Sequence, residues 1–310
     1  MKKMTSIVLA LGAAVLTPAF GTPPLTPAPF AMPDTQVIPF TSKDGSHAFK
    51  LFIGLPRNYA TRTERFPVIY LLDANFSFPL ADEILRHTAD RGQGRESIVV
   101  GIAYPGAETD IKIYERTRMQ DYTPTYSPTG GYGPETQVAS GGGPMFLNIL
   151  SDELLPFIDS HFRTNPAIRT IVGHSAGGLF ATYAMLTKPG LFSDYLVVSP
   201  SLWYDNRVMF GVAKDFIAEN SSLHANVFYA VGAFEEGTQH AMVSDLKDWN
   251  ALFDSAKLQG YSAKLMVFDG DTHEAVFPAA LTRGLRVLSN FAGEANGNKL
   301  ENAGNSPAKN

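Results

Sequence analysis

The sequence predicts an α/β fold in which a mostly parallel sheet is covered by helices on both faces. Short apolar runs typical of strands alternate with longer amphipathic runs typical of helices along most of the chain. Several strand-like runs, such as residues 66–72, are apolar throughout, as expected for a strand buried on both faces. The chain has 310 residues, of which 45% are hydrophobic, which is enough for one large core. We therefore expect a single domain over residues 34–292.

The expected elements follow from these runs and from the turn residues between them. Strands are expected at residues 36–41, 48–54, 66–72, 97–103, 170–172, 195–198, 227–231 and 264–268. Helices are expected at residues 81–87, 146–162, 179–186, 208–218, 242–257 and 278–291. Between residues 109 and 143 the apolar periodicity disappears, so an irregular insert is expected there, and it could wall a substrate site.

The two ends of the chain have compositions unlike the domain between them. A signal peptide is predicted at 1–21. Its typical features are the basic residues Lys2 and Lys3, an apolar run at 7–15 and small residues up to position 21. An uncleaved anchor is the alternative, although this run is short for a membrane span. A proline-rich linker is expected at 22–33 and a disordered tail at 293–310. The protein is thus expected to be periplasmic or secreted, without stable membrane association after cleavage.

Composition excludes several classes of chemistry. The chain contains no cysteine, so it has no disulfide, thiolate metal site or cysteine nucleophile. A net charge of −5 argues against a nucleic-acid or anionic-membrane partner. The His-Glu pair at 273–274 lacks the second histidine of a zinc protease motif, and the glycines at 141–143 lack the lysine of a phosphate loop. We expect no metal and no cofactor; the oligomeric state stays open.

The sequence Gly-His-Ser-Ala-Gly at 173–177 follows a β-branched strand and precedes a helix. This arrangement is typical of a nucleophile elbow, in which a serine lies on a strained turn between strand and helix. Gly173 and Gly177 suit such a turn, because side chains at these positions would clash with neighbouring backbone. Ser175 is therefore the candidate nucleophile; the alternative is a structural glycine-rich turn with an idle serine.

A serine hydroxyl needs a base to accept its proton. His273 lies in a loop just past the last strand, and open α/β sheets bind ligands at the carboxyl ends of their strands. It is the candidate base, with His240 as the fallback. His174 adjoins the serine, but neighbouring residues in such a turn point apart, so we expect it to pack beside the strand.

The base in turn needs an acid that fixes its tautomer. In the chain order serine, acid, histidine, the acid follows the strand before the histidine. That strand, at 227–231, leads to Glu235 and Glu236. Glu235 is the preferred acid, Glu236 is the alternative, and Asp245 on the next helix is a weaker candidate.

The oxyanion formed during ester cleavage needs backbone N–H donors. Ala176, directly after the serine, is expected to supply one, and Asn75 in the loop after the strand at 66–72 the other. The alternative for this loop is a plain turn closed by the Asp73 side chain.

Three further side chains are candidates for the wall of the substrate site. Arg116 and Arg118 lie in the irregular insert, and the alternative for them is surface pairing with Glu115 or Asp121. Trp203 follows a strand end and could either line the site or pack in the core.

Several segments in this order resemble one known family. The matching segments are 70–75, 116–124, 142–147, 153–156, 173–178, 199–203, 231–235 and 272–273. Together they resemble the esterase D-like branch of the α/β-hydrolases, and the periplasmic trilactone siderophore esterases most. The resemblance implies an α/β-hydrolase fold with Ser175 as nucleophile, His273 as base and Glu235 as acid, although some periplasmic members use a Ser-His pair. It also suggests that Arg116 and Arg118 contact an acidic or catecholate substrate.

These observations together predict an exported serine esterase that cleaves a small-molecule carboxylic ester through an acyl-enzyme. The alternatives are an acyltransferase, or a feruloyl or acetyl carbohydrate esterase, with the same triad. A third alternative is a non-catalytic exported binding protein on a hydrolase scaffold.

Overall fold

The computed structural model describes residues 30–129, 132–237 and 240–295. Residues from Pro33 onward form one compact unit. The signal peptide expected at 1–21, most of the linker expected at 22–33 and most of the tail expected at 293–310 lie outside the described residues. The last helix, however, extends to Ala295, past the predicted domain end. Within the described ranges, no helix combines the length and apolar character that crossing a membrane requires.

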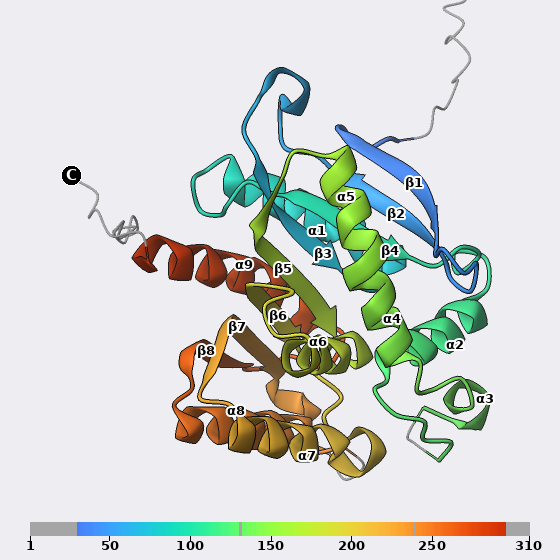
Figure 1. The fold of residues 1–310 in the computed structure, drawn as a ribbon, viewed down its shortest axis with the longest axis vertical. Coiled ribbons are helices and arrows are strands. Elements are labelled where there is room, and N and C mark those ends of the chain that lie inside the picture. Colours follow the sequence, from blue (N-terminus) through green and yellow to red (C-terminus); the bar gives the residue numbers. More distant parts are fainter. Residues whose placement is uncertain (1–29, 130–131, 238–239, 296–310) are drawn as a thin grey trace, which may run out of the picture. The chain divides into compact units, whose positions relative to one another are not determined.

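An eight-stranded sheet lies at the centre of the described part of the chain (Figure 1). Its strands are β1 (Thr35–Thr41), β2 (Ala48–Gly54), β3 (Phe66–Leu71), β4 (Ile98–Ala103), β5 (Thr164–His174), β6 (Asp194–Val198), β7 (Ser222–Gly232) and β8 (Gln259–Phe268). Their order across the sheet is β1-β2-β4-β3-β5-β6-β7-β8. Only the β1–β2 and β2–β4 pairs are antiparallel. The predicted mostly parallel sheet is confirmed.

Helices cover both faces of this sheet, as predicted. The helices are α1 (Ala74–Ala89), α2 (Ile111–Tyr122), α3 (Pro134–Gln137), α4 (Gly143–Ile149), α5 (Leu155–His161), α6 (Ala176–Thr187), α7 (Tyr204–Glu219), α8 (Met242–Ala256) and α9 (Val276–Ala295). One face packs against α1 and α9 around one apolar cluster. The other packs against α2, α4, α5, α6, α7 and α8 around a larger cluster.

The alternation of side chains along the central strands explains why two separate cores form. In β3 and just beyond it, Val68, Tyr70 and Leu72 belong to the larger cluster, whereas Ile69 and Leu71 belong to the smaller one. Successive side chains of a strand point to opposite faces of its sheet. A run that is apolar throughout therefore contributes to both cores, which is why these strands can lie in the middle.

The smaller core places α9 unusually close to the sheet. A Cβ atom at Gly284 would lie 2.7 Å from side-chain atoms of both Leu196 and Phe228, which are fully buried on β6 and β7. A helix approaches a sheet this closely only where it presents no side chain at the contact.

The structure corrects the prediction of an irregular insert at 109–143. Residues Ile111–Tyr122 form α2 and Pro134–Gln137 form the short α3. The buried residues of α2 are Met119, Asp121 and Tyr122, so the helix packs partly through polar groups and has no apolar stripe for the sequence to reveal.

Three other helices differ from their predicted bounds. Helix α1 begins at Ala74 instead of 81, despite the internal Pro79. The helix predicted at 146–162 consists of α4 and α5 joined by the π-helical segment Leu150–Leu154. In α7, residues 205–207 have positive φ values, so regular helix begins near the predicted position 208.

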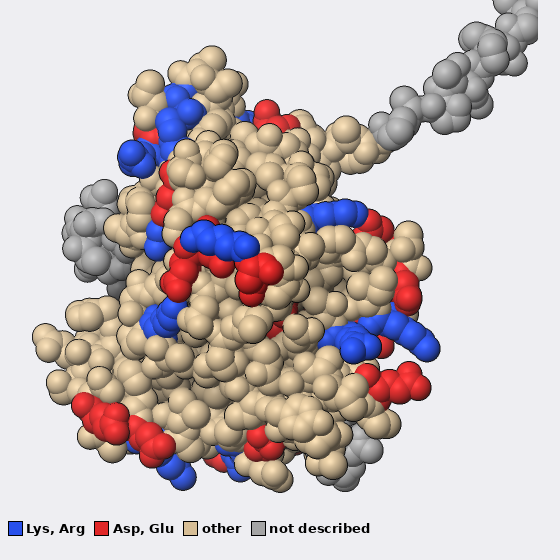
Figure 2. Space-filling view, turned by 45° about the vertical axis from the view of Figure 1, so that its right-hand side comes forward, with Lys and Arg blue, Asp and Glu red and all other residues tan. Residues whose placement is uncertain are grey.

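The surface carries charges of both signs. Figure 2 shows basic and acidic side chains close together in small groups on the face drawn. Surface ion pairs of the described residues include Lys188–Asp152 and Arg57–Asp90. Such exposed pairs contribute little to stability, so the cores described above hold the fold together.

Candidate active site

Ser175 lies on a strained turn between β5 and α6. Its φ and ψ are 59° and −119°, a combination that costs a residue with a side chain of the order of 1–3 kcal/mol. The turn leaves no room at Gly173, where a Cβ atom would lie 2.2 Å from the carbonyl oxygen of Gly177. The elbow geometry expected from the glycine spacing is therefore present.

Backbone hydrogen bonds fix this turn to the carboxyl end of the neighbouring strand β6. The Ser175 N–H donates to the carbonyl of Val198 at 3.0 Å, and the Ser175 carbonyl accepts from the Ser201 N–H at 3.1 Å. Ser175 itself is 8% exposed, and this small exposed part opens into two pockets.

His273 and Glu235 meet at the same edge of the sheet. Glu235 ends a short 3₁₀ turn, Ala233–Glu235, directly after β7, and His273 lies in the loop between β8 and α9. His273 Nδ1 and Glu235 Oε2 are 2.6 Å apart. The glutamate side chain is 3% exposed, whereas the imidazole is 36% exposed. The carboxylate of the pair is thus buried, and the imidazole is accessible from the pockets.

Three donors converge on the Glu235 carboxylate. Oε1 accepts from the Ser199 hydroxyl at 2.7 Å and from the Gly232 N–H at 2.6 Å, and Oε2 faces His273. Burial raises the pKa of Glu235, but the hydrogen bonds from His273, Ser199 and Gly232 outweigh burial and lower the pKa below its usual value. An ionised carboxylate only accepts hydrogen bonds, so His273 carries a proton on Nδ1 and, when neutral, presents Nε2 as an acceptor.

Ser175 and His273 line the same two pockets but are not hydrogen-bonded to each other in the described structure. The hydrogen-bonding partner of Ser175 Oγ is Ser201 Oγ, at 3.4 Å. The structure therefore brings Ser175, His273 and Glu235 together and forms the glutamate–histidine bond. Catalytic serine–histidine bonds are often long or poorly aligned without substrate.

The alternative acids and base contact other groups. Glu236 accepts hydrogen bonds from the N–H and hydroxyl of Ser244. Asp245 pairs with Arg207 at 2.9 Å. The ring of His240 stacks on Trp203, with 3.9 Å between ring centroids. Of the predicted acids, Glu235 is the one that contacts His273.

His174 packs against His273 rather than only beside the strand. Its Nε2 lies 2.9 Å from the backbone carbonyl of His273, and the two imidazole rings are 4.5 Å apart between centroids. Burial and the nearby His273 lower the pKa of His174 to about 4, so its ring is neutral at neutral pH. Because a carbonyl only accepts, the Nε2 of His174 carries the proton.

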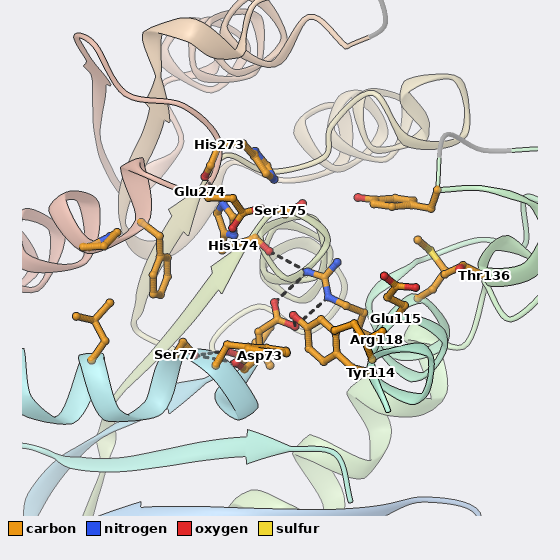
Figure 3. Close-up of a pocket in the computed structure, with 18 residues that line it drawn as sticks. Asp73, Ser77, Tyr114, Glu115, Arg118, Thr136, His174, Ser175, His273 and Glu274 are labelled. Carbon is orange, nitrogen blue, oxygen red and sulfur yellow. Dashed lines mark hydrogen bonds and ion pairs between the residues drawn. The ribbon is translucent and has the colours of Figure 1, made fainter. Parts of the chain in front are cut away.

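The first pocket, of about 570 Å³, extends from Ser175 toward α1 and α2. Figure 3 shows His174, Ser175 and His273 close together, facing Asp73, Tyr114 and Arg118. Its lining combines apolar side chains with charged ones. The apolar ones include Leu72, Phe76, Leu80, Ile111, Met119 and Phe277, and the charged ones are Asp73, Glu115, Arg118 and Glu274.

Arg118 lines this pocket, but Arg116 does not. Arg118 forms a two-point ion pair with Asp73 at 3.0 Å, and Tyr114 donates to the same carboxylate at 2.8 Å. Burial lowers the pKa of Arg118, but Asp73 and Tyr114 outweigh burial and hold the pKa well above its usual value. The ion-pair partner of Arg118 is thus Asp73, and not Glu115 or Asp121. Arg116 is exposed on α2 and is absent from the lining of both pockets, so its contact with substrate stays a prediction.

The predicted oxyanion donors both lie at helix N-termini, where backbone N–H groups have no partner within the helix. Ala176 begins α6. Asn75 is the second residue of α1, whose Phe76 and Ser77 N–H groups already donate to the Asp73 carbonyl. The Asn75 side chain points elsewhere, since it exchanges two hydrogen bonds with the backbone of Tyr104.

The Asp73 side chain does not close this turn, contrary to the plain-turn alternative. It makes no capping hydrogen bond to α1. Its carboxylate instead receives Arg118 and Tyr114, so the turn orients a charged group toward the pocket.

The second pocket, of about 600 Å³, lies toward α7 and α8 and shares Ser175, His273 and Tyr132 with the first. Trp203 lines it and donates from Nε1 to the Met242 sulfur at 3.1 Å. The Trp203 ring is partly buried, so it both lines this pocket and packs against its neighbours.

Sequence reasoning missed three hydroxyl groups at the site. Ser199 bonds Glu235, Ser201 bonds Ser175, and Tyr132 bonds Ser201 at 2.6 Å. Ser199 and Ser201 directly follow β6, so the rule that strand ends converge on one edge of the sheet could have found them. Tyr132 lies in the insert, and the sequence gives no signal for its position.

Comparisons with known proteins show the family to which the chain belongs. Residues 42–288 match the sequence profile of the Putative esterase family. The chain is 29% identical to the ferri-bacillibactin esterase BesA of Bacillus subtilis over 269 residues, which cover 83% of this chain and 90% of BesA. It is 30% identical to a siderophore enterobactin esterase of Emericella nidulans, and the match covers 72% of this chain and 82% of the relative.

A solved structure extends the agreement to the fold. An IroE-like serine hydrolase from Shewanella oneidensis superposes with a TM-score of 0.73 at 27% identity, covering 83% of this chain and 80% of the other. The predicted α/β-hydrolase fold is thereby confirmed. The family match and the related esterases also identify the protein as a carboxylic ester hydrolase. The chain belongs to the Putative esterase family.

Proposed function

We propose that this protein is a serine esterase in which Ser175 is the nucleophile, His273 the general base and Glu235 the acid that orients His273. The observation that supports this most is the carboxylate of Glu235, which is bound by three donors and fixes His273 in the tautomer that can accept a proton at Nε2. That imidazole lies at the pockets into which the strained Ser175 opens.

In the acylation step, Ser175 Oγ attacks the ester carbonyl while its proton passes to His273 Nε2. The N–H groups of Ala176 and Asn75 bind the resulting oxyanion. His273 then donates the proton to the alcohol oxygen as the carbon–oxygen bond breaks, which leaves Ser175 acylated. In the second half of the cycle, His273 takes a proton from water, the hydroxide attacks the acyl carbon, and Ser175 regains its proton as it leaves.

We propose esters of siderophores, including trilactones, as the substrate class. The names of BesA and of the Emericella nidulans relative support this class. The pockets of about 570 and 600 Å³ meet at Ser175, which gives room for bulky groups on both the acyl and the alcohol part of the ester. Arg118 is fixed by Asp73 at the first pocket and can contact an acidic or catecholate group there.

We also propose that the protein is exported, on the basis of the signal-like residues 1–21. Expression of the full chain in a Gram-negative host should yield a mature form that lacks this segment in the periplasm or medium. Intact-mass measurement of a full-length cytoplasmic product would contradict export.

The test of the catalytic proposal uses an active-site label. The wild-type protein should react with a fluorophosphonate at Ser175, located by peptide mass spectrometry, and should hydrolyse p-nitrophenyl butyrate. Ser175→Ala should lose both the label and at least about 10⁴-fold of the hydrolysis, with an unchanged melting temperature. Ser193→Ala, at a serine that does not line either pocket, serves as the control. Hydrolysis that survives in Ser175→Ala would refute the assignment.

The substrate class needs a separate test. The wild-type protein should hydrolyse a catechol trilactone with a kcat/KM about 100-fold or more above that for p-nitrophenyl butyrate, because binding energy outside the reacting bond can lower the barrier. Efficient hydrolysis of simple esters without hydrolysis of trilactones would retain the catalytic proposal and refute the substrate class.

A further inference from the structure

Two hydroxyl groups, those of Tyr132 and Ser201, form a hydrogen-bonded chain that leads to Ser175. Tyr132 Oη lies 2.6 Å from Ser201 Oγ, and Ser201 Oγ lies 3.4 Å from Ser175 Oγ. Ser201 is 1% exposed, and its backbone N–H is bonded to the carbonyl of Ser175, so its side chain is held against the elbow. Tyr132 lines both pockets at the point where they meet.

The direction of these hydrogen bonds follows from the glutamate at the far end. Glu235 only accepts, so His273 donates from Nδ1 and can accept at Nε2. When Ser175 donates its proton to Nε2, its oxygen is left to accept from Ser201. The Ser201 oxygen then accepts from Tyr132, whose hydroxyl keeps its proton because burial raises its pKa.

We propose that Ser201 and Tyr132 are positioning residues that orient the Ser175 hydroxyl toward His273 and stabilise Ser175 Oγ as its proton leaves. This inference rests on the proposed role of Ser175. As the Ser175 proton moves to His273, negative charge develops on Oγ, and the hydrogen bond from Ser201 becomes charge-assisted. Such bonds are roughly twice as strong as neutral ones, so the bond is worth more in the transition state than in the resting enzyme. Tyr132 donates to Ser201 and thereby strengthens the next bond in the chain.

The same bonds operate in both halves of the reaction. During attack, Ser201 donates to the oxygen that loses its proton to His273. During hydrolysis of the acyl-enzyme, the Ser175 oxygen is the leaving group and again accepts from Ser201 until His273 returns the proton. No additional proton is gained or lost, since Tyr132 and Ser201 each keep their own.

The first experiment compares Tyr132→Phe and Ser201→Ala with the wild-type protein. The readouts are the second-order rate of fluorophosphonate inactivation and the kcat and KM for p-nitrophenyl acetate, a substrate too small to fill either pocket. We expect Ser201→Ala to lower both the inactivation rate and kcat about 10- to 100-fold, and Tyr132→Phe about 3- to 10-fold, with little change in KM. A merely structural wall residue would change KM or the melting temperature and leave the inactivation rate unaffected.

Two further variants keep the test interpretable. Tyr126→Phe removes a hydroxyl from an exposed tyrosine of the same insert and should leave both rates unchanged. Ser201→Thr keeps a hydroxyl and should recover part of the activity lost in Ser201→Ala. If Ser201→Ala does not fold, Tyr132→Phe still decides, because the phenyl ring remains in place.

Two results would overturn the proposal. Inactivation rates within twofold of wild type in both variants would show that the hydroxyl chain does not affect Ser175. Faster inactivation would show that Ser201 restrains Ser175 instead of assisting it. A wild-type protein that takes no label at Ser175 would instead refute the proposed catalytic role itself, so the two failures are distinguishable.

Discussion

Two histidine–carboxylate pairs among the described residues are alike in composition and opposite in setting. In the His273–Glu235 pair the two side chains are 2.6 Å apart, and the imidazole is 36% exposed at the pockets. In the His47–Asp121 pair they are 3.1 Å apart, and the exposed fractions are 4% and 0%. The first pair lies at the carboxyl edge of the sheet, and the second connects the β1–β2 turn to α2.

The pKa shifts of the two carboxylates also have opposite directions. Burial raises the pKa of Glu235, but three donors outweigh it and lower the pKa. Burial likewise raises the pKa of Asp121, and the bond from His47 does not offset it. The pKa of a buried carboxylate is thus lowered only where several donors outweigh its burial. The comparison teaches that donors at the acid and access at the imidazole, rather than the residue pair itself, separate the proposed catalytic pair from the structural one.

The largest expected difference between the pairs concerns activity after loss of the imidazole. His273→Gln should lower kcat/KM for p-nitrophenyl butyrate about 10⁴-fold or more, because a carboxamide cannot accept the Ser175 proton. His47→Gln should change kcat/KM by only a few fold, because this side chain does not reach either main pocket. Comparable losses in both variants, at equal folded fractions by circular dichroism, would remove the distinction.

The next effect concerns the acid. Glu235→Gln should lower kcat about 10²- to 10⁴-fold, since a carboxamide neither fixes the same tautomer nor stabilises the imidazolium. Glu236→Gln is the matched control, because the neighbouring glutamate is exposed and binds Ser244 instead. If activity were lost in Glu236→Gln and retained in Glu235→Gln, the assignment of the acid would be reversed.

The third prediction concerns the contribution of the His47–Asp121 pair to the free energy of unfolding. Asp121→Ala removes the partner of a buried imidazole and should lower the free energy of unfolding by about 3 kcal/mol, measured by urea denaturation. The double variant His47→Phe/Asp121→Leu should be less destabilised, because neither member of the pair is left buried without the other. Equal stability of Asp121→Ala and wild type would show that this pair contributes nothing to the fold.

The smallest effects should appear in the pH dependence of stability, with opposite signs at two histidines. The hydrogen bond to Asp121 raises the pKa of His47. Its stabilisation is therefore present below the unfolded-state pKa of about 6.5 and is lost as pH rises through the raised value. The pKa of His174 is lowered to about 4, so stability falls as pH decreases from about 6.5 toward 4, by roughly 1–3 kcal/mol.

Denaturation curves of His47→Gln and His174→Gln between pH 4 and 8 would measure these two contributions. The free energy of unfolding of the wild type minus that of His174→Gln should increase with pH across the acidic range. The corresponding difference for His47→Gln should decrease with pH across the neutral range. The same slope in both differences would contradict the assigned protonation states.

Much of the fold could be predicted because its central strands are buried on both faces. Such strands are continuous apolar runs, and each run expected from the sequence corresponds to an observed strand. Helix α2 escaped prediction for the converse reason. It is held by Asp121 to His47 and by Arg118 to Asp73, and pairings between distant residues leave no periodicity in a sequence.

The site shows the same division. The positions of Ser175, Glu235 and His273 relative to strand ends could be predicted, because parallel strands bring their carboxyl ends to one edge. Some of the residues that hydrogen-bond to these three side chains or contact them could not be predicted. Tyr132 reaches Ser201 from the insert, and His174 contacts the base through a backbone carbonyl, and no local pattern marks such contacts.

Close contact at Gly284 has a consequence for the reaction. Helix α9 begins three residues after His273, and its first N–H bonds the carbonyl of Thr272, so the loop that carries the imidazole moves with this helix. A side chain at 284 would force either the helix or the side chains of Leu196 and Phe228 to shift, and a shift of the helix would move the imidazole. The position of His273, the proposed base, therefore depends in part on a missing side chain at 284, on the face of the sheet opposite most of the helices.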